Sequence, residues 1–146
     1  MSVPRFTIHL CTWQDAETQL RAIRTQVFIQ EQGVPEALEW DGEDAQAFHV
    51  LACDSAGRAI GTARLLLHHA LAHIGRMAVL PEWRRQGVGR ALLAGILAAA
   101  QARGASRAYL NAQTTAVPFY AQAGFAVEGE EFLDAGIPHL RMTRNL

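Results

Sequence analysis

Residues 79–93 read VLPEWRRQGVGRALL. Pro81 ends a strand because proline cannot donate to the ladder, and an apolar stripe then indicates a helix over residues 88–103. The loop between them has glycines where a phosphate oxygen can approach backbone that a Cβ would shield, and the free N–H groups and dipole of the helix start favour an anion there. We therefore predict a pyrophosphate site formed by Arg84, Arg85, Gln86, Gly87, Val88, Gly89 and Arg90.

Other phosphate-binding motifs do not fit this segment. It has no GxxxxGK(S/T) run, and GxGxxG fails because Leu92 stands where the third glycine would be. By itself a glycine loop before a helix is a weak signal, because Gly87 can simply ease a tight turn and Gly89 can simply let the helix pack on a strand. The rest of the chain has to decide between these interpretations.

The flanking segments predict strands and helices in one domain that spans residues 1–146. Apolar runs and turn residues indicate the order β-α-β-β-β-α-β-α-β-β. Strands are expected at residues 6–11, 48–54, 58–68, 73–80, 107–113, 125–129 and 139–143, and helices at 15–33, 88–103 and 115–123. Asp15 is the expected N-cap of the first helix. Residues 36–45 are expected to form a long acidic loop, and loops of such length are often functional.

Composition excludes several classes of protein. Half of the residues are hydrophobic, 18% are charged and the formal net charge is −1, which fits a globular chain and gives no electrostatic support for nucleic-acid binding. No apolar run reaches the roughly 18 residues of a membrane span, and we expect neither a signal peptide nor a membrane partner. Cys11 and Cys53 lack CxxC spacing, so we expect free thiols and a cytoplasmic location.

Two motifs carry a family resemblance. Arg84-x-x-Gly87-x-Gly89 matches the coenzyme A pyrophosphate signature of GNAT acetyltransferases, Gln/Arg-x-x-Gly-x-Gly/Ala. Residues 119–125, FYAQAGF, are similar to the late FYxxxGF motif of that superfamily. Further segments resemble its ElaA-like subgroup, namely residues 27–35 (VFIQEQGVP), 39–41 (EWD), 129–132 (GEEF) and 136–139 (GIPH).

The resemblance implies an α/β fold with a mixed, mostly antiparallel central sheet. In the GNAT fold this sheet is splayed between strands four and five, here residues 73–80 and 107–113, and helices cover both faces. Acetyl-CoA would bind in the splay and leave as coenzyme A. The implied activity is N-acetylation of a primary amine of a small molecule or a peptide, by direct attack on the thioester.

The resemblance also assigns the residues around the thioester. The carbonyl oxygen needs a hydrogen-bond donor, and this role falls to backbone N–H groups of Met77, Ala78 and Val79. Asn111 is expected to reach the pantetheine arm, with an ordinary strand-end position as the alternative. Phe119 is a candidate residue beside the cofactor, although packing in the core explains it better.

Proton transfer needs an acid and a base. Tyr120 holds the tyrosine position of the family motif, and a neutral phenol can donate a proton to the departing thiolate; aromatic packing is its alternative role. The candidates for the base are Glu31, at the end of the first helix, His49, on the second strand, and the carboxylates of the acidic loop, Glu39, Asp41 and Asp44. A histidine titrates in the useful range, but a lone histidine on an apolar strand is more often structural.

The acidic loop has two interpretations. Glu39, Asp41 and Asp44 would attract a cationic amine if the loop borders the acceptor groove, as the family layout implies, whereas a solvated surface loop needs no function. His139 and Arg141 are further candidates for the acceptor side. The sequence does not decide among these groups.

Three other questions stay open at this point. His68, His69 and His73 have no cysteine or carboxylate nearby to complete a ligand set, so we expect no metal site. An acyl-homoserine-lactone-synthase-like acyltransferase shares the scaffold and an RxxVF-like helix, here residues 24–28, and a non-catalytic acyl-CoA sensor would share the binding motifs. The acceptor amine is unidentified, and a homodimer is the commonest soluble assembly.

Overall fold

The computed structural model describes residues 5–146 and is built around one mixed sheet of eight strands. Its order is β1-β2-β3-β4-β5-β8-β6, and β7 pairs with β8. Neighbouring strands are antiparallel except β4 and β5, which run parallel, so the expected mixed, mostly antiparallel sheet is confirmed. The strands are β1 (Phe6–Thr12), β2 (Phe48–Asp54), β3 (Ala59–His68), β4 (Leu71–Val79), β5 (Arg107–Gln113), β6 (Ala126–Val127), β7 (Phe132–Asp134) and β8 (Ile137–Asn145).

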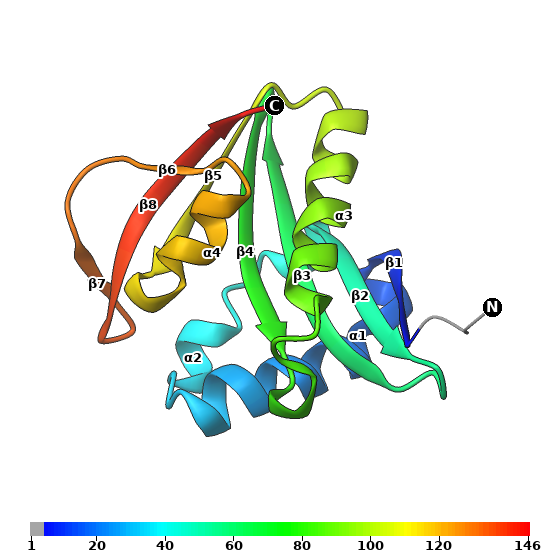
Figure 1. Ribbon diagram of the computed structural model, residues 1–146. Helices are drawn as coiled ribbons and strands as arrows, with labels where there is room; N and C mark the ends of the chain where they lie inside the picture. Colours follow the sequence, from blue (N-terminus) through cyan, green and yellow to red (C-terminus); the bar gives the residue numbers. More distant parts are fainter. Residues whose placement is uncertain (1–4) are drawn as a thin grey trace.

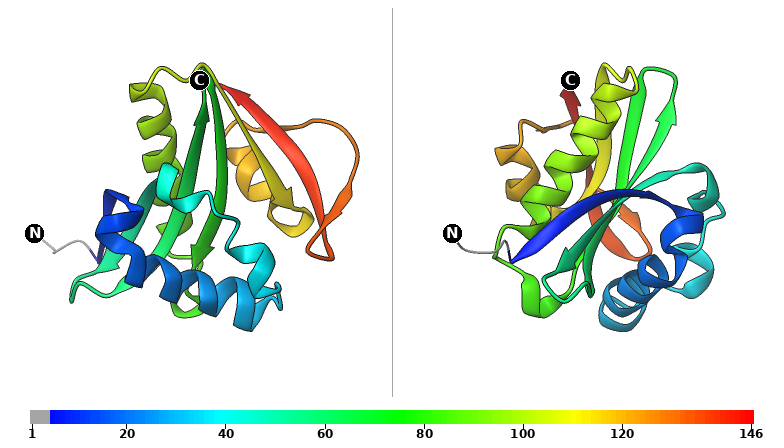
Figure 2. Two further views of the ribbon diagram at one scale, coloured as in Figure 1. Left: turned by 180° about the vertical axis from the view of Figure 1, so that it is seen from behind. Right: turned by 90° about the vertical axis from the view of Figure 1, so that its right-hand side faces the viewer.

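Helices cover both faces of the sheet (Figures 1 and 2). α3 (Val88–Ala102) and α1 (Trp13–Arg24) pack against the same four strands, β1 to β4, from opposite sides. α1 continues into a π-helical segment, η1 (Thr25–Glu31), and α4 (Val117–Gln122) lies beside β5 and β6. Short helical segments are α2 (Glu36–Glu39), η2 (Asp44–Gln46), η3 (Pro81–Trp83) and η4 (Thr114–Ala116). Among the described residues, none of the helices has the length and apolarity needed to span a membrane.

The centre of the sheet is enclosed on both faces, which brings α3 very close to β3. Every residue from Ile60 to Leu66 is buried. A Cβ added to Gly61 would lie 3.0 Å from Cδ1 of Leu92 on α3 and 3.1 Å from the carbonyl oxygen of Ala78 on β4. Gly61 therefore permits the close approach that fixes α3, and with it the predicted phosphate loop, against these strands.

β4 and β5 pair over a short stretch and then separate. The parallel ladder joins Leu71–His73 to Arg107–Tyr109, and the rings of His73 and Tyr109 stack at its end with centroids 4.3 Å apart. Beyond this point β4 continues on β3 and β5 continues on β8. Figure 1 shows the two strands diverging. The expected splay between strands four and five is therefore confirmed.

Three local expectations were wrong. Thr12, not Asp15, is the N-cap of α1: its backbone is extended and its Oγ1 accepts a hydrogen bond from the Asp15 N–H at 3.3 Å. Residues 36–45 are not a plain loop, because α2 and η2 lie within them and both Glu39 and Asp44 are buried. The short strand β7 was not expected, since three residues carry too little alternation to indicate a strand.

Candidate functional site

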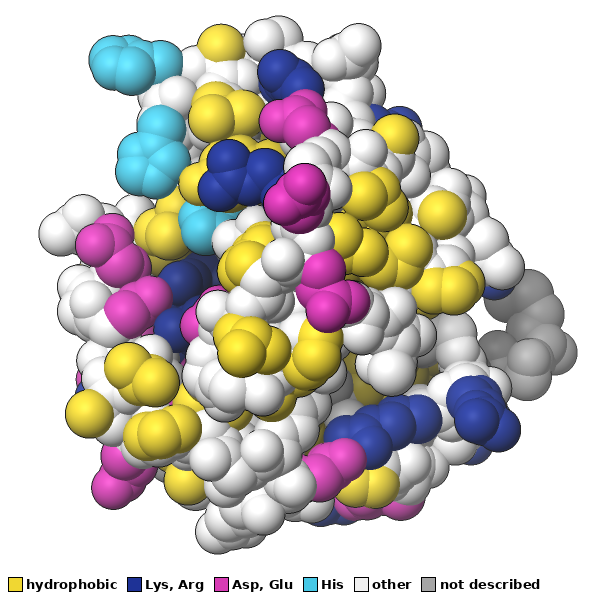
Figure 3. Space-filling model, turned by 90° about the vertical axis from the view of Figure 1, so that its left-hand side faces the viewer, with side chains coloured by type: hydrophobic (Ala, Val, Ile, Leu, Met, Phe, Trp, Pro, Cys, Tyr) yellow, Lys and Arg dark blue, Asp and Glu magenta, His cyan; other side chains and the backbone are white. Residues whose placement is uncertain are grey.

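A cavity of about 500 Å³ occupies the splay between β4 and β5. η1 and α2 form one wall, β4 and β5 line it lengthwise, and α4 with the β7–β8 turn form the other wall. Its volume is typical of ligand sites. Near the centre of the face in Figure 3, basic side chains and one histidine lie recessed between acidic and apolar ones, whereas other histidines and basic side chains project at the edges. The cavity extends from the phosphate loop, at Arg84 and Gly89, to His139 on β8.

Most of the predicted site residues border this cavity. The lining includes Met77, Ala78, Val79, Arg84, Gly89, Asn111, Phe119 and Tyr120. Arg85, Gln86, Gly87, Val88 and Arg90 lie next to it, in the loop and the first turn of α3. Glu31 and His49 are not among the lining residues.

β4 has a β-bulge in the cavity wall. Thr62 pairs with Ala78 and Arg64 with Gly75, so Arg76 and Met77 together stand opposite a single residue of β3. The φ of Arg76 is +50°, a left-handed conformation that costs a residue with a Cβ roughly 1–2 kcal/mol. Because a bulge leaves backbone groups unpaired in the ladder, N–H groups at this point of β4 are available to a ligand.

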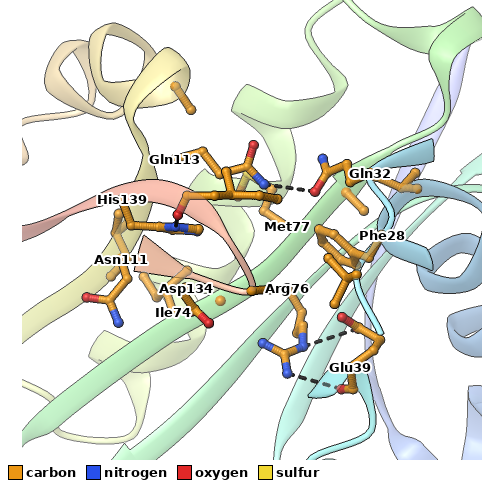
Figure 4. A pocket seen from close by; sticks show the side chains of 18 of the residues that line it. Phe28, Gln32, Glu39, Ile74, Arg76, Met77, Asn111, Gln113, Asp134 and His139 are labelled. Atoms are coloured by element: carbon orange, nitrogen blue, oxygen red, sulfur yellow. Dashed lines mark hydrogen bonds and ion pairs between the residues drawn. The ribbon is translucent and has the colours of Figure 1, made fainter. Parts of the chain in front are cut away.

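The acidic segment holds this bulge through the guanidinium of Arg76. Nη2 of Arg76 donates to the carbonyl oxygens of Glu39 (3.0 Å) and Leu38 (3.3 Å) and to Oδ2 of Asp41 (3.2 Å). Nε lies 3.1 Å from Oε2 of Glu39, at an angle that makes no hydrogen bond, so this contact is an ion pair (Figure 4). Arg76 is thereby fixed in its strained conformation.

Buried ion pairs fasten the acidic segment to α1 and β3. Arg24 binds Oε2 of Glu39 at 2.7 Å and Oδ1 of Asp44 at 2.6 Å, while Arg64 binds Asp44 at 3.2 Å and Asp41 at 2.8 Å. Buried charges require such partners, because desolvation without pairing is costly. The carboxylates therefore neutralise arginines, and neither expected role, attraction of an amine or a solvated loop, describes them.

The pKa values of two of these carboxylates, Asp41 and Asp44, are lowered. Burial alone would raise the pKa of Asp41, but hydrogen bonds from Arg64 and the Glu43 N–H, together with the charges of Arg64 and Arg76, bring it down to about 2. The pKa of Asp44 is also lowered, because hydrogen bonds and charge from Arg24 and Arg64 outweigh its burial. Both groups therefore remain ionised near neutral pH.

The phosphate loop presents backbone rather than side chains to a ligand. Gly87 is the N-cap of α3 with φ +87°, it offers no side-chain cap, and the first turn has no acidic residue. The first N–H groups of the helix consequently lack partners within it. A Cβ on Gly87 would meet nothing within 4 Å, whereas one on Gly89 would lie 3.4 Å from the ring of Phe119. The side chain of Val88 is buried in the core, so only its N–H remains for a ligand.

The polar and charged side chains of the loop differ in whether they are exposed or bind other residues of the protein. Arg85, which has φ +60°, and Arg90 are exposed beside the start of α3, whereas the Gln86 side chain donates to the Glu82 carbonyl oxygen at 2.9 Å. Nη1 and Nη2 of Arg84 each lie 2.7 Å from a carboxylate oxygen of Glu31. The hydrogen bond from Arg84 lowers the pKa of Glu31. This pairing leaves Glu31 poorly suited to the role of base for which the sequence offered it.

Tyr120 places its hydroxyl inside the cavity, next to the bulge. Its Oη donates to Sδ of Met77 at 3.7 Å, and the rings of Phe119 and Phe125 pack edge-on against it, with centroids 5.0 and 6.2 Å away. Burial raises the pKa of Tyr120 to about 12. Its phenol therefore keeps the proton at neutral pH and points toward β4. On β5, Oδ1 of Asn111 accepts a long hydrogen bond of 3.5 Å from Nε of Arg141.

His49 is enclosed in the protein, away from the cavity. Its ring packs against Trp13 with centroids 5.7 Å apart, and Nε2 donates to the carbonyl oxygen of Asp44 at 3.0 Å. Burial lowers the pKa of His49, and the side chain has no exposed surface. These surroundings support its structural interpretation and not the role of base.

The sequence did not single out several of the cavity residues as candidates for the site. Phe28 and Leu38 supply apolar wall, and Arg76 sits on the bulge. Oε1 of Gln32 accepts a hydrogen bond of 2.8 Å from Nε2 of Gln113, which links the end of η1 to the end of β5 (Figure 4). Only the strand register and the path of the chain after η1 bring these residues together. Within residues 5–146, His, Cys, Asp and Glu side chains form no group of three that could hold a metal ion.

Known proteins resemble this chain in sequence and in fold. A model of the acetyltransferase (GNAT) domain matches residues 13–146. The uncharacterized N-acetyltransferase YjcF of Bacillus subtilis (strain 168) is 40% identical over 124 residues, which cover 84% of this chain and 88% of YjcF. An acyl-CoA N-acyltransferase from Pseudomonas aeruginosa is 30% identical, with a TM-score of 0.84 over 95% of this chain and 99% of that chain. Escherichia coli ElaA is 25% identical, with a TM-score of 0.85 over 95% and 99%.

These similarities agree with the architecture. The predicted resemblance to the superfamily is confirmed by the domain match, and ElaA is among the similar structures. The parallel β4–β5 pair, its splay and the cavity between the strands fit the same assignment. From its sequence and its fold alike, the chain belongs to the GNAT acetyltransferase family.

Proposed function

We propose that the protein transfers an acetyl group from acetyl-CoA directly to a primary amine of a small molecule or a peptide. One observation carries the proposal: a single cavity joins the glycine loop at Gly89 to the bulge of β4 and the hydroxyl of Tyr120. A ligand with an anionic end, an extended arm and a reactive thioester needs these three features in this order.

The loop fits the pyrophosphate of acetyl-CoA. The open space at Gly87 and the unpartnered N–H groups at the start of α3 form a cradle that a side chain would obstruct. The exposed guanidinium groups of Arg85 and Arg90 add positive charge beside it. The pantetheine arm would then follow β4 and contact Asn111 in the splay.

Two groups of the chain would serve the chemistry. Backbone N–H groups of Met77, Ala78 and Val79 would donate to the thioester oxygen as charge develops there, which is the kind of interaction that contributes most to acyl transfer. Tyr120 would protonate the departing sulfur. Its raised pKa suits this role, because the phenol holds a proton to give over the whole physiological range.

We infer that the protein works in a reducing, cytoplasmic setting. We also infer that the acceptor enters the cavity from the side formed by η1, α2 and β8. Cys11 and Cys53 are free thiols, which suits such a compartment. Apolar surface from Phe28 and Leu38 lies on this side next to the charges of Glu39 and Arg76. The acceptor is thus proposed to be a free amine and not a nucleic acid or a membrane component.

Calorimetric titration with acetyl-CoA tests the cofactor. We expect micromolar binding by the parent and none by Gly87→Glu, which places a carboxylate in the phosphate cradle. Gly57→Glu is a matched control, because Gly57 also has a positive φ (+84°) and open space around it, in the β2–β3 turn. Equal binding by all three proteins would contradict the phosphate site, and no binding by the parent would contradict the acetyl-CoA assignment.

Turnover is then measured as thiol release with spermidine, glucosamine, 2-phenylethylamine, free amino acids and a short peptide. Release with at least one amine supports the acetyltransferase. Binding of acetyl-CoA without release would favour the sensor. Failure to bind acetyl-CoA, combined with acyl transfer from a longer acyl-CoA or from acyl-carrier protein, would favour the synthase-like acyltransferase.

A further inference from the structure

His139 lines the cavity from β8, and the chemistry described above leaves it without a role. Its side chain is 9% exposed, and its ring stacks on that of Phe132 with centroids 5.9 Å apart. Figure 4 shows it on the β8 side of the cavity, across from Phe28 and Glu39. We infer, on the basis of the proposed function, that His139 accepts the proton that the acceptor's ammonium group must lose.

A backbone contact fixes the tautomer of this ring. Nδ1 of His139 lies 2.6 Å from the carbonyl oxygen of Ile137. A carbonyl oxygen can only accept a hydrogen bond, so Nδ1 carries the proton and, in the neutral ring, the lone pair is on Nε2. Nε2 is thus the basic atom of a side chain that borders the cavity.

The same contact survives protonation. When Nε2 gains a proton, Nδ1 still donates to Ile137, so the ring need not turn, and the carbonyl dipole stabilises the imidazolium. In a catalytic triad an acidic residue orients a histidine and stabilises its cation in this way. Ile137 and His139 are only two residues apart, so the start of β8 itself provides this hydrogen bond.

Other titratable or charged groups share the cavity. They are Glu39 on α2, His73 and Arg76 on β4, Arg84, Tyr120 on α4 and Asp134 on β7. The carboxylate of Glu39 forms ion pairs with Arg24 and Arg76, so it is not free to act as the base. Burial, with the positive charges of Arg64, His68, Arg141 and Arg76, lowers the pKa of His73 to about 4, which makes it a weak base.

Two of these groups need a separate argument. The pKa of Tyr120 is raised by burial to about 12, so Tyr120 is a proton donor and not an acceptor at neutral pH. Asp134 is exposed at the β7–β8 turn and is the remaining rival of His139. The experiment therefore has to distinguish a carboxylate from an imidazole.

The proton balance closes with these residues. His139 takes one proton from the ammonium, and the neutral amine then attacks the thioester carbon. The C–N bond forms and the C–S bond breaks, and Tyr120 gives its proton to the departing sulfur. The attacking nitrogen then loses a second proton, which returns Tyr120 to its protonated form. His139 returns its proton to water, so that ammonium and acetyl-CoA yield amide, coenzyme A thiol and one released proton.

The test compares pH profiles of kcat/KM for the parent, His139→Asn and Asp134→Asn, with the amine that gives the fastest thiol release. Asparagine can still donate to the Ile137 carbonyl but has no basic nitrogen. We expect His139→Asn to lose about 10²–10³-fold in kcat/KM at pH 7, within the usual contribution of a general base, and to lose the acidic limb of the profile. Asp134→Asn is expected to keep that limb.

Three further measurements keep the result clear. Calorimetry should give His139→Asn the parent's affinity for acetyl-CoA, and His68→Asn, on the exposed end of β3, should keep the parent's profile. Nitrogen NMR of the parent's histidines, assigned through the backbone resonances, should show the Nδ1–H tautomer for His139, and this measurement does not depend on the folding of the variant. An Nε2–H tautomer, or an unchanged acidic limb in a folded His139→Asn, would overturn the inference. A parent that releases no thiol with any amine would instead overturn the proposed function, and the role of His139 with it.

Discussion

Arg84 ties Glu31, at the end of η1, to Val79, at the end of β4. Its two terminal nitrogens each lie 2.7 Å from a carboxylate oxygen of Glu31, and Nε donates to the Val79 carbonyl oxygen at 2.9 Å. The three nitrogens of the guanidinium are all engaged within the protein. Arg84 therefore braces the loop before α3, where the pyrophosphate site is proposed, against the helix that borders the cavity.

The first prediction concerns this brace. Both side chains are more than a third exposed, so the pair should contribute about 0.5–1 kcal/mol, the upper part of the range for exposed pairs. Arg84→Gln and Glu31→Gln are each expected to lower the free energy of unfolding by that amount in urea titrations, and the double variant by no more than either single change. Glu31→Gln should keep the parent's pH profile of kcat/KM. An additive double variant would show that the two side chains act separately.

The second prediction concerns the proton donor. Tyr120→Phe removes only the hydroxyl, so acetyl-CoA affinity by calorimetry should stay within about twofold. Loss of a general acid should lower kcat for thiol release about 10²–10³-fold, as is usual for such groups. Tyr109→Phe is the matched control, because the Tyr109 ring stacks on His73 and Tyr109 is not among the residues that line the cavity. Equal activity of the two variants would assign Tyr120 to packing alone.

The third prediction concerns the buried ion pairs. Arg24 is 1% exposed, and its removal leaves Glu39 and Asp44 buried with fewer partners. Arg24→Ala should therefore cost about 3–5 kcal/mol of folding free energy. Arg58→Ala, which breaks the exposed pair with Glu82, should cost less than about 1 kcal/mol. Urea titration measures both, and similar losses would contradict the importance of burial.

Local sequence was enough to predict the helices and turns that line the cavity, whereas the roles proposed for their residues came from the family resemblance. The glycines of the loop, the stripe of α3 and the tyrosine of α4 each depend on neighbours within one helix or turn. The splay between β4 and β5 followed only from the family resemblance, because strand order is not a local property. The structure then confirmed it through a ladder that stops at His73 and Tyr109.

Long-range pairing explains what the sequence could not predict. Glu31 and Arg84 are 53 residues apart, and Arg76 and Glu39 are 37 apart. From the sequence alone, Glu31 was a candidate base and Arg84 a phosphate ligand. Arg76 was a residue of a strand, and Glu39 was part of an acidic loop. Their actual roles depend on which charge each one meets, and no periodicity encodes that. For the same reason the sequence left His49 open between a base and a structural residue, because only the folded chain shows that Trp13 and Asp44 enclose it.

The last prediction concerns acid sensitivity. His73 has an ordinary pKa of 6.5 in the unfolded chain and a pKa lowered to about 4 in the folded one, chiefly by burial. The unfolded state therefore binds the proton more readily, so this contribution to stability is complete above pH 6.5 and is lost as the pH falls toward 4. A shift of this size corresponds to an upper limit of about 2 kcal/mol at pH 5. His73→Phe keeps a ring against Tyr109 but cannot titrate, so its melting temperature should fall less than the parent's between pH 7 and 5. Some dependence should remain, because burial also lowers the pKa of His49. An equal fall in melting temperature for the two proteins between pH 7 and 5 would mean that protonation of His73 does not cause the loss of stability.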